Sequence, residues 1–150
     1  MADREHASEQ DLALLDRFPE LFTQWYLSSR ESCMGRGIAV DKGWYALLEE
    51  MSVELQAYNE KAKASATEES PYLPVEYGQI KEKFGELRVY IDNFTDEAQE
   101  IVSKYEGLSR KTCEFCGSKD QVQIWGSWRK ASCLSCSQQR AASNAIESYI

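Results

Sequence analysis

The clearest hydrophobic pattern in the chain predicts a long amphipathic helix over residues 41–66. Asp41 is placed to cap its N-terminus. Intervals of three and four residues separate its apolar positions, which are Trp44, Leu47, Leu48, Met51, Leu55 and Tyr58. The opposite face is acidic and consists of Glu49, Glu50, Glu54 and Glu60. We expect this helix to bury its apolar face and to expose its acidic face.

Two shorter helices are predicted ahead of the long one. After a polar tail at residues 1–8, Ser8 and Asp11 form the pattern of an N-cap followed by a first-turn acid. Pro19 ends that helix and is placed to open a second one, which runs to Ser29. The predicted buried stripe of the second helix is Leu21, Phe22, Trp25 and Tyr26.

Alternating apolar and polar residues over 75–93 predict an antiparallel β-hairpin, with Gly85-Glu86 as its two-residue turn. The expected buried pairs are Ile80 with Ile91, Glu82 with Val89, and Phe84 with Leu87. The opposite face gathers three cations and an aromatic, namely Lys81, Lys83, Arg88 and Tyr90. That face is either a contact for an anionic partner or a solvated surface whose positive charges balance the acidic face of the helix at 41–66.

Two further helices and a second hairpin are predicted beyond residue 94. Thr95 begins a helix whose buried face is Ile101, Val102, Tyr105 and Leu108. The second hairpin turns about Gly126-Ser127 and places Trp125 directly opposite Trp128. These tryptophans either pack on the main body or, if exposed, provide the best anchor for a partner. A terminal helix follows.

Four cysteines carry the strongest chemical signal. Cys113 and Cys116 form one Cys-x-x-Cys pair, Cys133 and Cys136 form a second, and sixteen residues separate the pairs. This is the spacing of a structural zinc site, because each pair aims two sulfurs at one point. We expect one structural Zn²⁺, with two disulfides or four unliganded thiols as the alternatives. Four protein sulfurs leave no coordination position open for water or substrate. Gly117 follows the first pair, where a knuckle turn favours a residue that tolerates positive φ.

The order of elements predicts an α+β fold with a helical N-terminal half, a central antiparallel β-hairpin and a C-terminal zinc module. An order of knuckle, hairpin and helix is typical of a treble clef, and a zinc ribbon with a final strand is the alternative. We expect an α+β body at residues 1–112, a candidate linker at 59–71 and a zinc module at 113–150, packed on the body or appended to it.

Charge and hydropathy narrow the function classes. The formal net charge of −8 is divided into −7 for residues 1–70, −2 for 71–112 and +1 for 113–150. Such a balance disfavours broad binding to a phosphate backbone and suits a protein that binds a soluble partner. No apolar run is long enough to span a membrane, and the polar N-terminus does not resemble a signal peptide. We therefore expect a cytoplasmic protein with reduced cysteines.

Three strings in the chain resemble an uncharacterised family of small proteins common in bacteriophages and prophages. They are GWYALL at 43–48, QIKEKFGELRVY at 79–90 and TCEFCG at 112–117, followed by Trp128 and the second cysteine pair. The resemblance covers residues 19–138, and the lysine-rich hairpin string is its most specific part. It implies a phage-type origin, with the host cytoplasm as the location, and supports zinc at the four cysteines. It implies no activity. Members often keep the second half of the metal motif only loosely, whereas both pairs are intact here.

The sequence favours a non-enzymatic binding protein that acts through a protein partner in a host or phage complex. The alternative is a nucleic-acid-binding protein that uses the basic hairpin face together with Trp128, Arg129 and Lys130. An enzyme is the least favoured class, because the chain has no glycine-rich phosphate loop and no histidine placed to serve as a base. The sequence predicts no oligomeric state.

Overall fold

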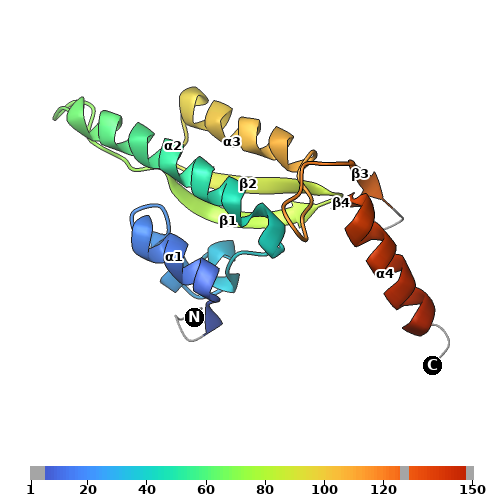
Figure 1. Cartoon of the computed structure of the whole chain (residues 1–150). Coiled ribbons are helices and arrows are strands. Elements are labelled where there is room, and N and C mark those ends of the chain that lie inside the picture. Colours follow the sequence, from blue (N-terminus) through green and yellow to red (C-terminus); the bar gives the residue numbers. More distant parts are fainter. Residues whose placement is uncertain (1–5, 126–128, 148–150) are drawn as a thin grey trace.

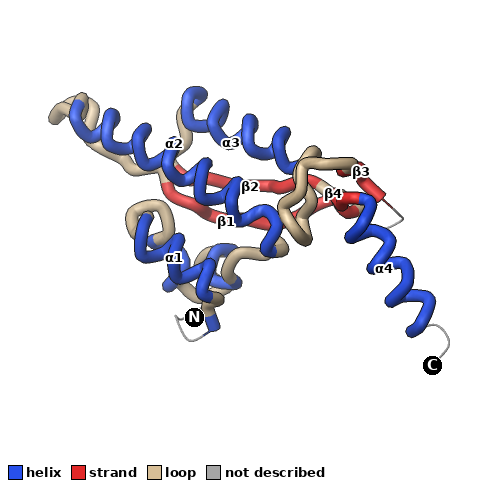
Figure 2. Tube along the Cα trace, viewed as in Figure 1, coloured by secondary structure: helices blue, strands red, loops and turns tan. Residues whose placement is uncertain are grey.

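The computed structural model describes residues 6–125 and 129–147, and for Trp125 and residues 142–147 it describes the backbone alone. The predicted α+β class is confirmed, with a helical N-terminal half and a β-hairpin in the middle (Figure 1; Figure 2). The helices are α1 (Glu9–Arg17), α2 (Tyr45–Ala64), α3 (Asp96–Ser109) and α4 (Leu134–Glu147). The strands are β1 (Glu76–Lys83), β2 (Glu86–Asp92), β3 (Val122–Trp125) and β4 (Lys130–Cys133). Short 3₁₀ segments lie at Thr23–Tyr26, Cys33–Arg36 and Lys42–Trp44.

Helices α2 and α3 lie along one side of the β1–β2 hairpin (Figure 1). Helix α1 and the 3₁₀ segments that follow it lie on the other side in this view. The core forms between these layers, and its fully buried members include Phe22, Trp44, Leu48, Met51, Tyr77, Ile80, Leu87 and Val102. Burying apolar surface on this scale is the main favourable contribution to the stability of the body.

Helix α1 begins as predicted. The Ser8 hydroxyl accepts the Asp11 amide, and the Asp11 carboxylate accepts the Ser8 amide, each at 3.0 Å. This capping box satisfies two amides that the first turn of a helix would otherwise leave unpaired.

The prediction of a second helix at residues 19–29 is wrong, because only the 3₁₀ segment Thr23–Tyr26 forms there. The carbonyl of Leu21 accepts the amide of Tyr77 at 2.8 Å, so this backbone bonds to strand β1 instead of continuing a helical ladder. Tyr26, which was expected in the buried stripe, is 42% exposed. Leu21, Phe22 and Trp25 are buried as expected.

Helix α2 differs from the prediction at both ends. It starts at Tyr45, after a 3₁₀ turn, and Asp41 makes no side-chain capping bond. It ends at Ala64, two residues before the predicted end at residue 66, and residues 59–64 of the candidate linker at 59–71 are still helical. Within that stretch, buried Asn59 donates to the Val75 carbonyl at 3.0 Å and accepts the Val75 amide at 2.9 Å. The pair ties the last turns of α2 to the start of the hairpin.

The β1–β2 hairpin is confirmed, but its register is shifted by two residues from the one expected. Lys83 pairs with Glu86, so the turn is Phe84-Gly85 and not Gly85-Glu86. Both turn residues have positive φ, 54° and 83°, as a type I′ turn requires. From residue 79 onward, a shift of two keeps the strand residues on their predicted faces, so Ile80, Leu87 and Val89 stay buried. An irregularity between Tyr77 and Gln79 turns Tyr77 to the buried side. Phe84 instead moves from the buried face to the turn and is 64% exposed.

Helix α3 begins as predicted, since the Thr95 hydroxyl accepts the Ala98 amide at 3.3 Å. Val102 and Tyr105 are buried on its inner face, and Ile101 is half-buried. Leu108, which was expected on that face, is 40% exposed.

Candidate metal centre

The first cysteine pair lies in a tight knuckle directly after α3. The Gly117 amide donates to the Cys113 carbonyl at 2.9 Å, and the Cys113 amide donates to the Ser118 carbonyl at 2.8 Å. Gly117 has φ of +81°, which confirms the prediction of a residue that tolerates the left-handed region. This local folding turns Cys113 and Cys116 toward one point.

The second cysteine pair lies where strand β4 passes into helix α4. Cys133 is the last residue of β4, and Cys136 lies in the first turn of α4. The Cys136 amide donates to the Cys133 sulfur at 3.4 Å. Strand β3 pairs with β4 and brings this second pair back beside the knuckle.

The structure brings all four predicted ligands together. The sulfurs of Cys113, Cys116, Cys133 and Cys136 lie within 4.8 Å of one another, and those of Cys116 and Cys133 are 3.7 Å apart. Four thiolates around one tetrahedral ion with bonds of about 2.3 Å would have sulfur–sulfur distances of about 3.8 Å. The four side chains therefore fit a metal ion and fill its whole first shell.

Four thiols this close cannot all carry charge unless a cation joins them. Burial raises the pKa of Cys113, but hydrogen bonds to its sulfur from the backbone and from Cys116 outweigh it and lower that pKa to about 6. Burial and the neighbouring cysteine side chains raise the pKa of Cys136. Cys113 therefore loses its proton more readily than an ordinary cysteine, and Cys136 loses its proton less readily. A divalent ion would stabilise the thiolate form of all four.

The second hairpin is confirmed, with a register that differs from the expected one. Trp125 pairs with Lys130, so it does not lie opposite Trp128. The connection between the strands therefore spans residues 126–129 and is longer than the predicted Gly126-Ser127 turn. Trp128 and the side chain of Trp125 lie outside the described residues, and the prediction that the two tryptophans either pack on the main body or anchor a partner stays a prediction.

The knuckle is joined to the start of α2 by hydrogen bonds. The Gly43 amide donates to the Glu114 carbonyl at 2.7 Å, and the Asp41 amide donates to Glu114 Oε2 at 3.1 Å. Trp44 Nε1 donates to the Thr112 carbonyl at 2.9 Å. The Gly43 amide is one that an Asp41 side chain would have capped, so this junction explains why the expected cap is absent.

Gly43 allows the two backbones of this junction to touch. A Cβ atom at position 43 would lie 2.3 Å from the Cys113 carbonyl oxygen and 2.5 Å from that of Glu114. Both are backbone atoms of the knuckle, so they cannot rotate away as a side chain can. The metal knuckle therefore rests on a glycine of the body.

Gly43→Ala is expected to lower the free energy of unfolding by about 3 kcal/mol and to weaken metal binding, because the knuckle must move to admit the methyl group. Thermal melts and metal competition with a chromophoric chelator measure the two effects. Gly107→Ala is the matched control, since a Cβ there meets nothing within 4 Å and alanine favours the α3 helix. A stable, fully metal-binding G43A protein would contradict the contact.

Lys130 connects the metal module to the first hairpin. Its ammonium nitrogen lies 2.9 Å from Glu82 Oε2 and 3.7 Å from Glu114 Oε1. The Glu114 side chain is 2% exposed, and this burial raises its pKa, partly offset by the Asp41 amide and by Lys130. Glu82 also accepts the Gly85 amide at 3.0 Å. The carboxylate of Glu82, a residue that the alternation places on the apolar face of the first hairpin, thus binds a cation of the second hairpin.

Lys130→Met is expected to lower the free energy of unfolding by about 2 kcal/mol. This loss lies between the cost of removing an exposed ion pair and the cost of breaking a fully buried one. The substitution would leave Glu82 and Glu114 facing each other without a cation. Adding Glu114→Gln should restore part of the loss, because a neutral amide can still accept the Asp41 amide. Denaturant unfolding of the single and double variants measures this coupling, and equal stability of the two variants would contradict it.

The predicted basic face is only partly an open surface. Lys83 and Tyr90 are exposed, and Lys81 and Arg88 are half-buried. The Lys81 ammonium lies 5.6 Å from the centre of the Tyr90 ring, and that of Lys83 lies 5.7 Å from the Phe84 ring. Arg88 lies 3.7 Å from Glu86. Arg129 is exposed, whereas Lys130 is occupied by Glu82 and Glu114.

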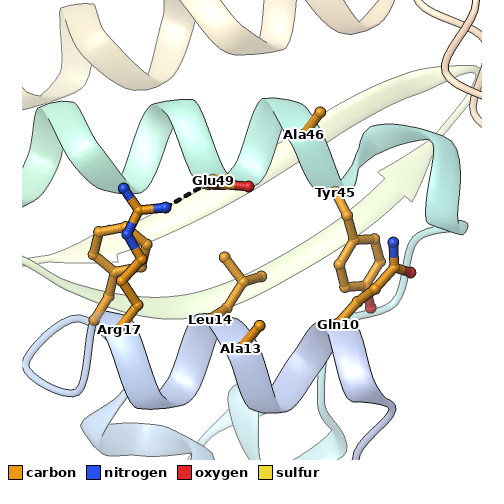
Figure 3. A pocket seen from close by; sticks show the side chains of 8 residues that line it. Gln10, Ala13, Leu14, Arg17, Tyr45, Ala46 and Glu49 are labelled. Atoms are coloured by element: carbon orange, nitrogen blue, oxygen red, sulfur yellow. Dashed lines mark hydrogen bonds and ion pairs between the residues drawn. The ribbon is translucent and has the colours of Figure 1, made fainter.

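A groove of about 270 Å³ lies between α1 and α2 (Figure 3). Leu14 and Ala13 project into it from α1, and Arg17 reaches across to Glu49 of α2 at 2.5 Å. Tyr45 closes one end and donates to the Asp11 carboxylate at 2.6 Å. Burial and the Asp11 carboxylate raise the pKa of Tyr45, so it stays a neutral donor. The lining resembles a packed helix contact rather than a set of reacting groups.

Two contributors to the metal centre were missed from sequence. Glu114 was treated only as a spacer between cysteines, although an acid at that position, in a module with more bases than acids, was a usable signal. Gly43 lies in the GWYALL string, but nothing local indicates that the residue must approach a knuckle 70 positions away in the chain. Such contacts depend on tertiary structure.

No helix among the described residues is long and apolar enough to cross a membrane. Comparison of the chain with protein-family models, with curated proteins and with solved structures gives no match. The function is therefore inferred from the site and its surroundings.

Proposed function

We propose that this chain is a zinc-stabilised acidic binding protein of phage type, which acts in the cytoplasm of the host cell through a protein partner and not by catalysis. The observation that carries this proposal is the cluster of four sulfurs. Because four cysteines fill a tetrahedral shell, an ion there has no free position for substrate and serves to hold the fold together.

Zinc is the ion that best suits the donor set. Four thiolates with tetrahedral spacing select zinc or iron among the common metals, and a single ion held by Cys-x-x-Cys knuckles is typical of structural zinc. The order of knuckle, β3–β4 hairpin and α4 supports a treble-clef module in preference to a ribbon, since the chain ends the module in a helix.

Exposed apolar side chains support a protein partner. Among the described residues, Phe84 is 64% exposed and Ile124 is 37% exposed, and Ile124 packs against the Phe84-Gly85 turn. Large apolar groups at the surface are costly in solution and are common where another protein docks. The net charge of −8 makes a polyanion the less suitable partner.

Affinity purification tests the proposal. The tagged, zinc-loaded protein is exposed to a host lysate at micromolar concentration, and bound proteins are identified by mass spectrometry and then measured one at a time in purified form. We expect a partner that binds the intact protein in a defined stoichiometry. Recovery of nothing above a tag-only column would contradict the proposed function.

A nucleic acid is the second candidate partner, favoured by the aromatic rings that lie under Lys81 and Lys83 on the hairpin. Single-stranded nucleic acids bind to surfaces of this kind by stacking and by charge. If this candidate is correct, affinity for an oligonucleotide falls steeply as salt rises. A flat salt response excludes it.

A further inference from the structure

The tip of the first hairpin holds an aromatic residue in a backbone conformation that disfavours it. Phe84 has φ of 54° and occupies the first central position of the two-residue turn. Asn and Gly are the residues suited to that position, and a bulky side chain with positive φ is an outlier. Strain of this kind persists where the rest of the structure or a function requires the residue.

Burial in the protein does not account for Phe84, because its side chain is 64% exposed. The adjacent Gly85 packs tightly on the second hairpin, since a Cβ there would lie 2.8 Å from the Arg129 carbonyl oxygen and 2.9 Å from Ile124 Cγ2. Ile124 is itself 37% exposed. The two hairpins together therefore support an aromatic side chain that projects into solvent beside a second apolar one.

The charge around this tip is positive, although the chain as a whole is acidic. Lys83 and Arg129 are both exposed; the Lys83 ammonium lies 5.7 Å from the centre of the Phe84 ring, and the Arg129 backbone packs against Gly85. The nearby acids are engaged by other cations, Glu82 by Lys130, and Glu86 by Arg88 and Arg110 at 3.7 and 3.5 Å. We call the four residues Lys83, Phe84, Ile124 and Arg129 the hairpin-tip surface.

Resting on the proposed function, we infer that the hairpin-tip surface is its binding site, and that the partner contributes an acidic protein segment with a large apolar side chain. The apolar side chain would pack on Phe84 and Ile124, and carboxylates would pair with Lys83 and Arg129. A nucleic acid fits less well, because two exposed cations are too few for a backbone footprint on a chain of charge −8.

Phe84→Asn separates binding from stability. Asn-Gly is the preferred type I′ turn, so this variant should melt about 2 °C higher than the wild type. The same change removes the anchor and should weaken partner binding about tenfold or more. Phe94→Asn is the matched control, since Phe94 is 63% exposed and belongs to the segment between β2 and α3. It should leave binding unchanged.

The probes are a displayed library of random short peptides, the purified partner from the capture experiment and oligodeoxythymidylate, each applied to the full zinc-loaded chain. We expect enriched peptides that combine Asp or Glu with Leu, Phe or Trp, and loss of their binding in F84N. The inference about the hairpin-tip surface fails if the enriched peptides are basic or uncharged, if the selection is empty, or if F84N binds at wild-type strength. In each of these cases the proposed function still stands if the lysate experiment captures a partner. Oligonucleotide binding that F84N abolishes would assign the tip to nucleic acid instead. If neither library nor lysate gives a ligand, both proposals fail.

Discussion

Chelation of the metal ion is expected to unfold residues 113–147 and to loosen the start of α2. Ligation of zinc contributes about 10–16 kcal/mol to folding in small zinc modules at neutral pH. The β3–β4 sheet has two short strands, which are not stable alone in water. Far-UV circular dichroism and hydrogen exchange, followed as chelator is added, measure the effect.

The Gly43 amide gives this experiment a specific readout in the body. It donates to Glu114 in the knuckle, so its exchange with solvent should accelerate when the metal leaves. Cys113→Ser should reproduce the effect of chelation. Cys33→Ser is the matched control, because Cys33 is exposed and lies outside the cluster of four. A chelated protein with an unchanged spectrum, or equal effects of the two serine variants, would contradict a structural metal.

Trp44→Ala is expected to lower the free energy of unfolding by about 3–5 kcal/mol, because its side chain is fully buried and its loss leaves a large cavity. Trp44→Phe should cost less, about 1–3 kcal/mol, of which part comes from leaving the Thr112 carbonyl without its donor. Guanidinium unfolding followed by fluorescence measures both changes.

Trp25 provides the comparison that isolates the hydrogen bond. Its ring is also buried, but its Nε1 has no hydrogen-bond partner among the described residues. Trp25→Phe therefore removes similar volume and no hydrogen bond, and it should destabilise the protein less than Trp44→Phe. If the Trp25 variant is the less stable of the two, the bond to Thr112 contributes little.

Hydrophobic periodicity predicted faces better than it predicted register. Ile80, Leu87 and Val89 are on the buried side as expected, yet both hairpins are shifted by two residues. A shift of two conserves every strand face, so alternation cannot distinguish the two registers. Intrinsic turn preference did not select the observed register, because Phe84 occupies a turn position that favours Asn or Gly. Gly85 instead packs against the second hairpin, which is a tertiary contact.

The four cysteines of the metal centre could be predicted from the sequence, whereas the contacts around them could not. Two Cys-x-x-Cys pairs define their own local turns, so their convergence follows from spacing. The contacts of Gly43 with the knuckle, and of Lys130 with Glu82 and Glu114, join segments far apart in the chain. No local pattern indicates such contacts. The helix expected at 19–29 failed for the same reason, since a bond between Leu21 and Tyr77 redirects the backbone.

Helix α4 starts at the cluster itself, with Cys136 in its first turn, and it projects away from the body (Figure 1). Its 14 residues make a rod of about 21 Å. A rotation of about 10° at the sulfurs would sweep the far end of such a rod through about 4 Å. The coordination geometry of a bound ion would thus set the direction of α4 relative to the body, and an ion that prefers a different geometry would turn the helix in another direction.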